Sequence, residues 1–183
     1  AIQYAESKYH GAAAACIQAI HFYSIGRLGS GFNDKASGSG TNKNVKVDSV
    51  YVDNFLAKHP DFFKFIAHSL AIRAQGDRVI TPKIFTCFHW LLSNINEAKA
   101  DDFMYKLTTG AGIETTHPIF ALRKRIIISK TDTTQLKSKA KLTGLQLAAI
   151  LHSTWNLYIT GQPAKKKFSF KKVPALLNGN LVD

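Results

Sequence analysis

The stretch Asp101–Ser129, DDFMYKLTTGAGIETTHPIFALRKRIIIS, decides the fold that we expect for this chain. Phe103 and Leu107 are four residues apart, so they lie on one face of a helix. Gly110 can end that helix because glycine adopts positive φ at no steric cost. After a Gly/Thr loop, Pro118 opens a second helix, since its fixed φ suits a first helical position. The stretch therefore predicts a helical hairpin, and its second helix carries a block of basic residues.

Apolar residues recur at helical spacing on both sides of this hairpin, and no segment predicts a convincing sheet. We expect an all-α fold, a compact bundle of about seven or eight helices in a single domain, residues 1–183. The Gly/Ser-rich segment 30–46 is predicted to be a flexible loop and segment 163–183 an extended basic tail. The other expected helices are Ala1–Ser7, Ala12–Ile25, Asp48–Lys58, Asp61–Ala74, Thr81–Ile95 and Thr143–Thr160. Asp48–Lys58 and Asp61–Ala74 fit either a helix-turn-helix or plain bundle helices, and the second is favoured.

Composition places the chain among folded globular proteins. Of its 183 residues, 45% are hydrophobic and 12 are Phe, which suffices for a sizeable core. No apolar run approaches the roughly 20 residues that span a bilayer. Cys16 and Cys87 both lie in apolar helical patterns, which favours reduced, buried thiols and a cytoplasmic location. The chain has neither an initiator Met nor a signal peptide, so we expect it to begin inside a longer protein.

Positive charge is concentrated in the last third of the chain. The net charge is +12, from 24 Lys and Arg against 12 Asp and Glu. Segment 120–172 holds twelve of these cations and one acid, Asp132. Such asymmetry indicates an anionic partner, most often nucleic acid, although a solvated basic face remains an alternative. The candidate nucleic-acid-binding residues are Arg123, Lys124, Arg125, Lys130, Lys137, Lys139, Lys141, Lys165, Lys166, Lys167, Lys171 and Lys172.

Three local patterns carry a family resemblance. They are F-x-x-x-L-x-x-G-x-G at Phe103–Gly112, H-P-I-x-A-L-R-x-R at His117–Arg125 and W-N-x-Y-x-x-G at Trp155–Gly161. Together they resemble the C-terminal helical region of phage and mobile-element ParB/sulfiredoxin-like proteins of the Asp-Gly-Gln-His-Arg type. The resemblance implies DNA-associated work in a bacterial host cell, near the nucleoid. It also implies that any catalytic chemistry lies in an N-terminal ParB-like domain outside this segment.

The chain itself shows no catalytic motif, and we predict no catalytic residue, metal site or cofactor. Cys87 and His89 point to opposite sides of a helix and so cannot share a metal. Glu114, alone in the hairpin loop, is a weak acid/base candidate because no partner is visible. The sequence therefore predicts a DNA-binding helical module that contacts mainly phosphates. Two alternatives stay open, a module that docks an acidic host protein and the non-catalytic half of an enzyme whose active site lies upstream.

Overall fold

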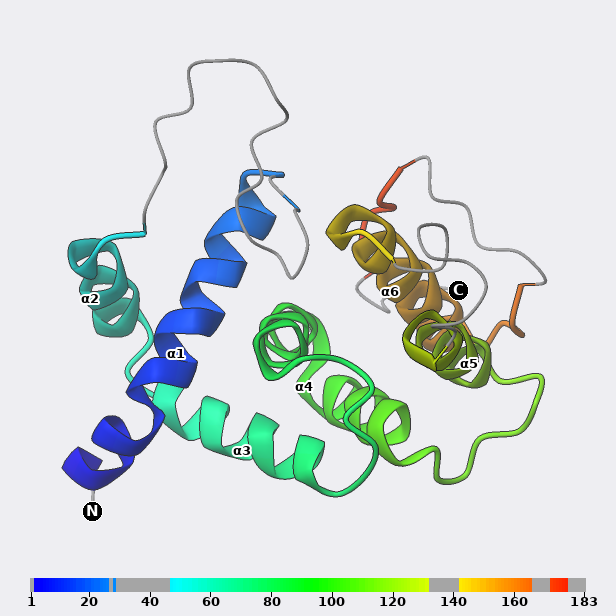
Figure 1. Ribbon diagram of the computed structural model, residues 1–183, viewed down its shortest axis with the longest axis horizontal. Coiled ribbons are helices and arrows are strands. Elements are labelled where there is room, and N and C mark those ends of the chain that lie inside the picture. Colours follow the sequence, from blue (N-terminus) through cyan, green and yellow to red (C-terminus); the bar gives the residue numbers. More distant parts are fainter. Residues whose placement is uncertain (1, 27, 29–46, 132–141, 166–171, 178–183) are drawn as a thin grey trace.

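The computed structural model describes residues 2–26, 28, 47–131, 142–165 and 172–177. Of residues 2–7 and 128–131 it describes the backbone only. All regular structure in this part of the chain is helical, which confirms the predicted all-α class. Figure 1 shows α4 in the middle of the molecule, with α1 and α3 on one side of it and α5 and α6 side by side on the other. The helices are α1 (Ile2–Ser24), α2 (Ser49–Lys58), α3 (Phe62–Ala74), α4 (Pro82–Thr109), α5 (Pro118–Thr131) and α6 (Gly144–Ile159).

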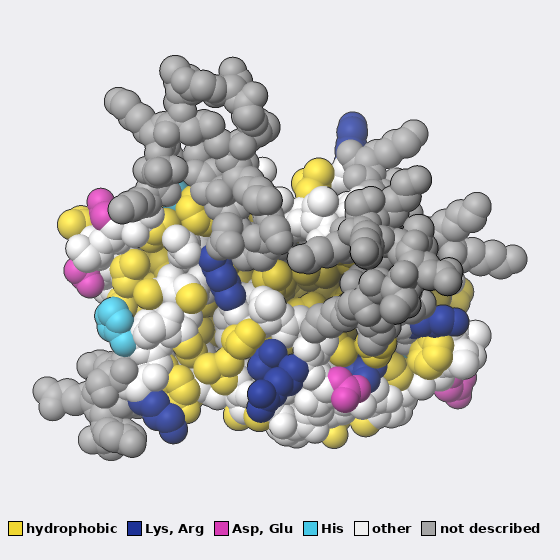
Figure 2. All heavy atoms as spheres, in the orientation of Figure 1, with side chains coloured by type: hydrophobic (Ala, Val, Ile, Leu, Met, Phe, Trp, Pro, Cys, Tyr) yellow, Lys and Arg dark blue, Asp and Glu magenta, His cyan; other side chains and the backbone are white. Residues whose placement is uncertain are grey.

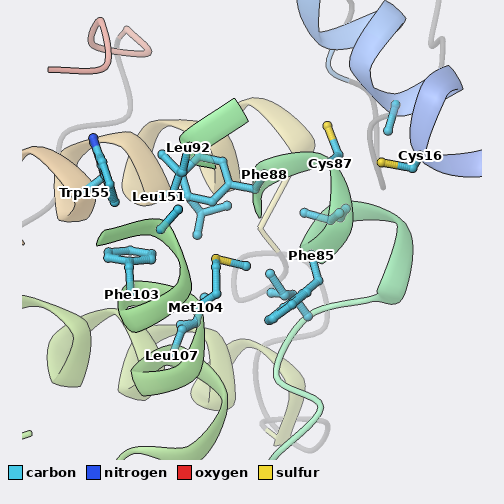
Figure 3. Packing of buried hydrophobic residues seen from close by; sticks show 14 of the residues in the cluster. Cys16, Phe85, Cys87, Phe88, Leu92, Phe103, Met104, Leu107, Leu151 and Trp155 are labelled. Carbon is cyan, nitrogen blue, oxygen red and sulfur yellow. The ribbon is translucent and has the colours of Figure 1, made fainter. Parts of the chain in front are cut away.

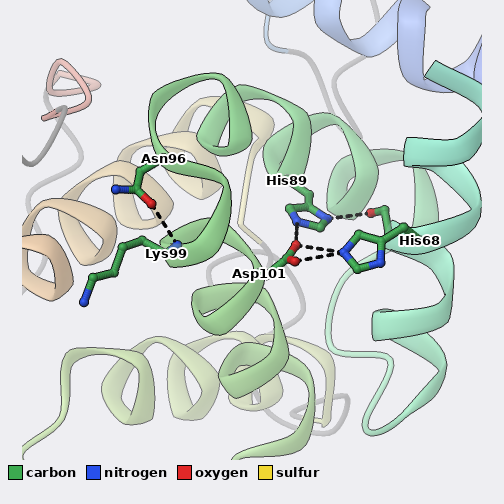
Figure 4. A network of polar contacts seen from close by, with 6 residues as sticks. His68, His89, Asn96, Lys99 and Asp101 are labelled. Carbon is green, nitrogen blue, oxygen red and sulfur yellow. Dashed lines mark hydrogen bonds and ion pairs between the residues drawn. The ribbon is translucent and has the colours of Figure 1, made fainter. Parts of the chain in front are cut away.

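The described residues form six helices, fewer than the seven or eight that the sequence predicts. The helices expected on either side of Gly11 form one helix, α1, because the four alanines that follow this glycine favour helix strongly. The helices expected on either side of Asn96 merge into α4, which leaves helical geometry at that residue (φ −158°, ψ 104°). The Oδ1 atom of Asn96 accepts a hydrogen bond from the Lys99 N–H at 3.0 Å and caps the second half (Figure 4).

The core lies where α4 meets its neighbours, since α4 packs against α1, α3, α5 and α6. Its helical period buries Phe88 and Leu92 in the first half and Phe103 in the second. In Figure 3 the α4 side chains Phe88 and Leu92 lie beside Leu151 of α6, and Phe103 lies beside Trp155. The rings of Phe103 and Trp155 meet edge to face at 5.6 Å between centroids. Helix α4 is therefore the central helix, as its apolar pattern indicates.

Three helix ends follow local signals in the sequence. Asp48 accepts the Tyr51 N–H at 2.8 Å at the start of α2, and Gly110 ends α4 with φ 71°. Thr143 and Gln146 form a reciprocal capping box at the start of α6. The predicted loop 30–46 lies outside the described residues, and so does most of the predicted tail 163–183.

Residues 172–177, which belong to the described part of the tail, lie along α6. Trp155 Nε1–H donates to the Leu177 carbonyl at 2.9 Å, and the Asn156 amide donates to the Ala175 carbonyl at 2.8 Å. The Asn156 Oδ1 atom accepts the Leu177 N–H at 2.9 Å. These bonds satisfy backbone N–H and carbonyl groups of a segment that has no regular structure, so the segment is held against α6.

Both cysteines are buried free thiols. Burial raises the pKa of the Cys16 thiol to about 12 and that of Cys87 well above its usual value, so both are unreactive at neutral pH. None of the helices in the described residues combines the length and the apolar character needed to cross a membrane.

Candidate nucleic-acid interface

The turn between α4 and α5 sets the position of the basic block. Gly110 and Gly112 both take left-handed backbone geometry, with φ of 71° and 65°. The His117 carbonyl and its Nδ1 atom accept the N–H groups of Phe120 and Ile119, at 3.0 and 3.2 Å. These two bonds satisfy donors that a helix start leaves unpaired, so α5 begins at a fixed point beside the end of α4.

Arg123, the first cation of the block, is committed to intramolecular bonds. Its side chain is 12% exposed, and its guanidinium donates to the Leu107 carbonyl and to Asp77 Oδ2, the latter at 2.7 Å. The guanidinium also lies against Gly110, where an added Cβ would come within 3.2 Å of Cζ. Arg123 thus joins α5 to the C-terminal end of α4.

Lys124 and Lys165 come together at one surface hollow, although they are 41 positions apart in the chain. Both side chains are exposed, and the hollow encloses about 560 Å³. A hydrogen bond from the Ala164 N–H to the Thr116 carbonyl, 2.9 Å long, holds the segment after α6 against the hairpin loop. We call this site the lysine hollow. The residues that line it are Thr115, Thr116, Phe120, Ala121, Lys124, Pro163, Ala164 and Lys165, with no carboxylate among them.

The other predicted cations do not line the lysine hollow, or they cannot be placed. Arg125 is half-buried and makes no hydrogen bond or ion pair with a described residue, and Lys172 is exposed. Lys130 lies in α5, but its side chain is not described. On the face in Figure 2, the Lys and Arg side chains form separate groups. The predicted cations that lie outside the described residues are Lys137, Lys139, Lys141, Lys166, Lys167 and Lys171.

A second hollow, of about 360 Å³, adjoins the lysine hollow and shares Thr116 and Pro163 with it. We call it the His117 hollow. Its wall joins two motifs that are distant in the sequence, the hairpin loop and the end of α6. The residues that line it are Gly112, Glu114, Thr116, His117, Pro118, Leu157, Tyr158, Gly161, Gln162 and Pro163. Sequence reasoning missed the two threonines and Gln162 as site residues, because only the folded chain brings them beside the basic block.

A polar network joins α3 to α4 on the other side of the molecule (Figure 4). The Asp101 carboxylate lies 2.9 Å from Nε2 of both His68 and His89, and Nδ1 of His89 lies 3.0 Å from Ser69 Oγ. A carboxylate only accepts, so both imidazoles donate to it from Nε2, and the Ser69 hydroxyl donates to His89. Ser69 and His89 are completely buried, so this network holds no accessible nucleophile.

The neighbouring carboxylates of Asp101 and Asp102 each have specific partners. Asp101 bonds the two histidines, whereas Asp102 accepts from Lys106 at 2.7 Å and from the Tyr158 hydroxyl. Within the described residues, no group of three His, Cys, Asp or Glu side chains could hold a metal ion.

Comparisons of the chain with protein-family models, with curated proteins and with solved structures give no match. The relationship to ParB-like proteins therefore stays a prediction from the sequence patterns.

Proposed function

We propose that this chain is a DNA-binding helical module that contacts mainly phosphates. The observation that carries the proposal is the convergence of Lys124 and Lys165, from two distant segments, on one hollow. Among the described residues, no carboxylate lines that hollow to neutralise them. By contrast, Lys64 and Lys106 on the α3 and α4 surfaces lie 2.7 Å from carboxylates of their own helices or caps. The lysine pair at the hollow is thus available for an anion from outside the chain.

The remaining groups at the lysine hollow also suit a phosphate backbone. Thr115 and Thr116 are exposed, and their hydroxyls are donors of the kind that proteins use on phosphate oxygens. Each lysine that neutralises a phosphate releases a counterion, so affinity should fall as salt rises, with a slope of about −0.9 per phosphate on duplex DNA. The six predicted lysines beyond the described residues would add to this effect in proportion to the contacts that they make.

Fluorescence anisotropy with a short labelled DNA, measured from about 50 to about 200 mM salt, tests the proposal. Changing Lys124 and Lys165 together to Ala should reduce the salt slope by about 2 and weaken binding about tenfold or more. The matched control changes Lys8 and Lys58, which are exposed on α1 and α2, and it should bind almost as tightly as the native chain. Absence of binding, binding indifferent to salt, or an equal loss in both double variants would contradict the proposal.

The same proposal includes membership of a phage or mobile-element ParB-like protein that works at the bacterial nucleoid. The coding sequence upstream of Ala1 tests this part. An upstream ParB-like domain with the Asp-Gly-Gln-His-Arg signature would support it, and a start codon directly before Ala1 would refute it.

One observation favours the alternative of a protein-interaction module. Helix α2 contains no fully buried residue, and it exposes Val50 and Tyr51 by 62% and 36%. Apolar side chains on such a helix suit a protein partner better than a phosphate backbone. Purification separates the two functions. Nucleic acid that accompanies the protein raises the ratio of absorbance at 260 to that at 280 nm, whereas an acidic protein partner co-purifies without such a rise.

A further inference from the structure

The His117 hollow has the shape of a small binding site. Its volume of about 360 Å³ lies in the range of ligand pockets, and it opens beside the lysine hollow. Gly112 and Gly161 line it with left-handed backbone, both at φ 65°, and a Cβ at either position would meet no atom within 4 Å. The rim is therefore open at two glycines, where another molecule can approach the backbone closely.

Among the polar side chains that line this hollow, those of His117 and Glu114 have bonding capacity that the described residues leave unused. His117 Nδ1 accepts the Ile119 N–H, so the neutral ring carries its proton on Nε2 and offers one donor. Partial burial and then the positive charge of Lys106 lower the pKa of this imidazole, so the ring is neutral at pH 7. The Glu114 carboxylate is exposed and has no hydrogen bond or ion pair with a described residue. Tyr158 is not available, because its hydroxyl already donates to Asp102.

The Glu114 carboxylate and the imidazole N–H of His117 together match one nucleobase better than the others. Guanine has two neighbouring donors on its Watson–Crick edge, N1–H and the N2 amino group, and the acceptor O6 next to them. A carboxylate can accept both donors at once, in charge-assisted hydrogen bonds. Adenine, cytosine and thymine each offer only one donor group on that edge. In a duplex this edge is already paired, so only an unpaired base can present it.

We propose that the His117 hollow binds one unpaired guanine of a single DNA strand. Glu114 would accept from N1–H and N2–H, His117 Nε2–H would donate to O6, and the neighbouring phosphate would lie on Lys124 and Lys165. The two hollows share Thr116 and Pro163, so a base and its own backbone can occupy them together. This inference rests on the proposed DNA binding and adds to it a strand preference and a base preference.

Anisotropy titrations with single strands of dT that differ at one central position test the inference. A central dG should bind about five- to a hundredfold more tightly than the all-dT strand, the range of discrimination for one bidentate contact. Deoxyinosine, which lacks the 2-amino group, should lose most of this gain. Pairing the dG strand with its complement should remove it completely.

Glu114→Gln is the decisive variant, because an amide offers one acceptor and one donor where the carboxylate offers two acceptors. It should abolish the preference for dG and keep the affinity for the all-dT strand. Glu97→Gln, a change of an exposed glutamate in α4 outside both hollows, is the matched control and should keep the preference. Circular dichroism shows whether each variant keeps its helices.

The outcomes separate this inference from the function on which it rests. If no DNA binds even at low salt, both fail. If all strands bind alike, or if the duplex binds as well as the dG strand, only the guanine site is overturned. Retention of the dG preference in Glu114→Gln would overturn the assigned contact. Free dGMP that binds as tightly as the dG strand would overturn a strand-binding site in favour of a nucleotide site.

Discussion

The polar network of His68, Ser69, His89 and Asp101 joins α3 to α4, and we call it the seam. The seam and the pair of hollows at α5 and α6 use polar residues in opposite ways. In the seam, the buried His89 ring is paired with the partly exposed Asp101 carboxylate on one side and with the Ser69 hydroxyl on the other. Around the hollows, the side chains of Glu114, Lys124 and Lys165 are exposed and make no hydrogen bond or ion pair with a described residue. Polar groups that are paired inside a protein stabilise it, and unpaired groups at a surface are free to contact a ligand. The contrast predicts that changes in the seam lower stability, whereas changes at the hollows lower affinity.

The largest expected loss of stability comes from His89→Ala in the seam. This change opens a cavity at a completely buried site and leaves the Ser69 hydroxyl without its acceptor. We expect the free energy of unfolding to fall by about 3 kcal/mol. Urea denaturation followed by circular dichroism measures it. His68→Ala removes the half-exposed imidazole from the same carboxylate and should cost at most about 1 kcal/mol. Equal losses in both variants would show that burial does not set the strength of this network.

The same histidine makes stability depend on pH. Burial lowers the pKa of the His89 imidazole from 6.5 to about 4, although the Asp101 carboxylate opposes the shift. Between these values the unfolded chain binds a proton that the folded chain does not, so stability is complete above pH 6.5 and falls as the pH drops towards 4. The loss should approach about 3 kcal/mol. Burial also lowers the pKa of His152, which adds a loss of the same sign.

Unfolding in urea between about pH 7 and about pH 4.5 tests this dependence. His89→Asn is the comparison variant, because an amide preserves some hydrogen bonding and does not titrate. Its stability should fall less steeply with acid than that of the native chain. Parallel curves for the two proteins would assign the acid sensitivity to other groups.

Two neighbouring residues of α5 give the sharpest test of the contrast. Arg123→Ala removes the bonds to the Leu107 carbonyl and to Asp77, and it should lower stability by about 2 kcal/mol. Lys124→Ala should change stability by no more than about 0.5 kcal/mol and reduce the salt slope of DNA binding by about 1. Thermal unfolding and anisotropy on both variants show whether Arg123→Ala lowers mainly stability and Lys124→Ala mainly the binding of DNA. If Arg123→Ala weakens DNA binding more than Lys124→Ala does, the division between structural and contact cations is wrong.

Local chemistry made the hairpin predictable. The helix before Gly110, the left-handed turn and the restart at Pro118 each follow from the backbone preference of one residue type. The helix count was less predictable because a residue that often ends a helix, such as Gly11 or Asn96, does not always do so. Helix α1 runs through Gly11 into four alanines, and α4 continues past Asn96 with a single non-helical residue.

The candidate site was harder to derive, because neighbouring residues of the same charge have different roles. Arg123 and Lys124 follow each other in the sequence, and successive residues of a helix point about 100° apart. Which of them meets the Leu107 carbonyl depends on how α5 lies against the end of α4, a relation between elements that residue patterns do not contain. The pairing of Lys124 with Lys165 likewise follows from the bond between Ala164 and Thr116, which no spacing in the sequence indicates.

The smallest expected effect distinguishes two serines that a sequence cannot tell apart. Ser69 Oγ lies 3.0 Å from His89 Nδ1, whereas the buried Ser93 Oγ has no hydrogen-bond partner among the described residues. Ser69→Ala should therefore cost about 1 kcal/mol, because it leaves the imidazole nitrogen buried and unpaired. Ser93→Ala removes a hydroxyl that is already unpaired, so the free energy of unfolding should stay the same or rise by up to about 1 kcal/mol. Urea denaturation of the two variants side by side decides the matter. A loss in Ser93→Ala as large as that in Ser69→Ala would mean that the Ser93 hydroxyl has a partner in solution.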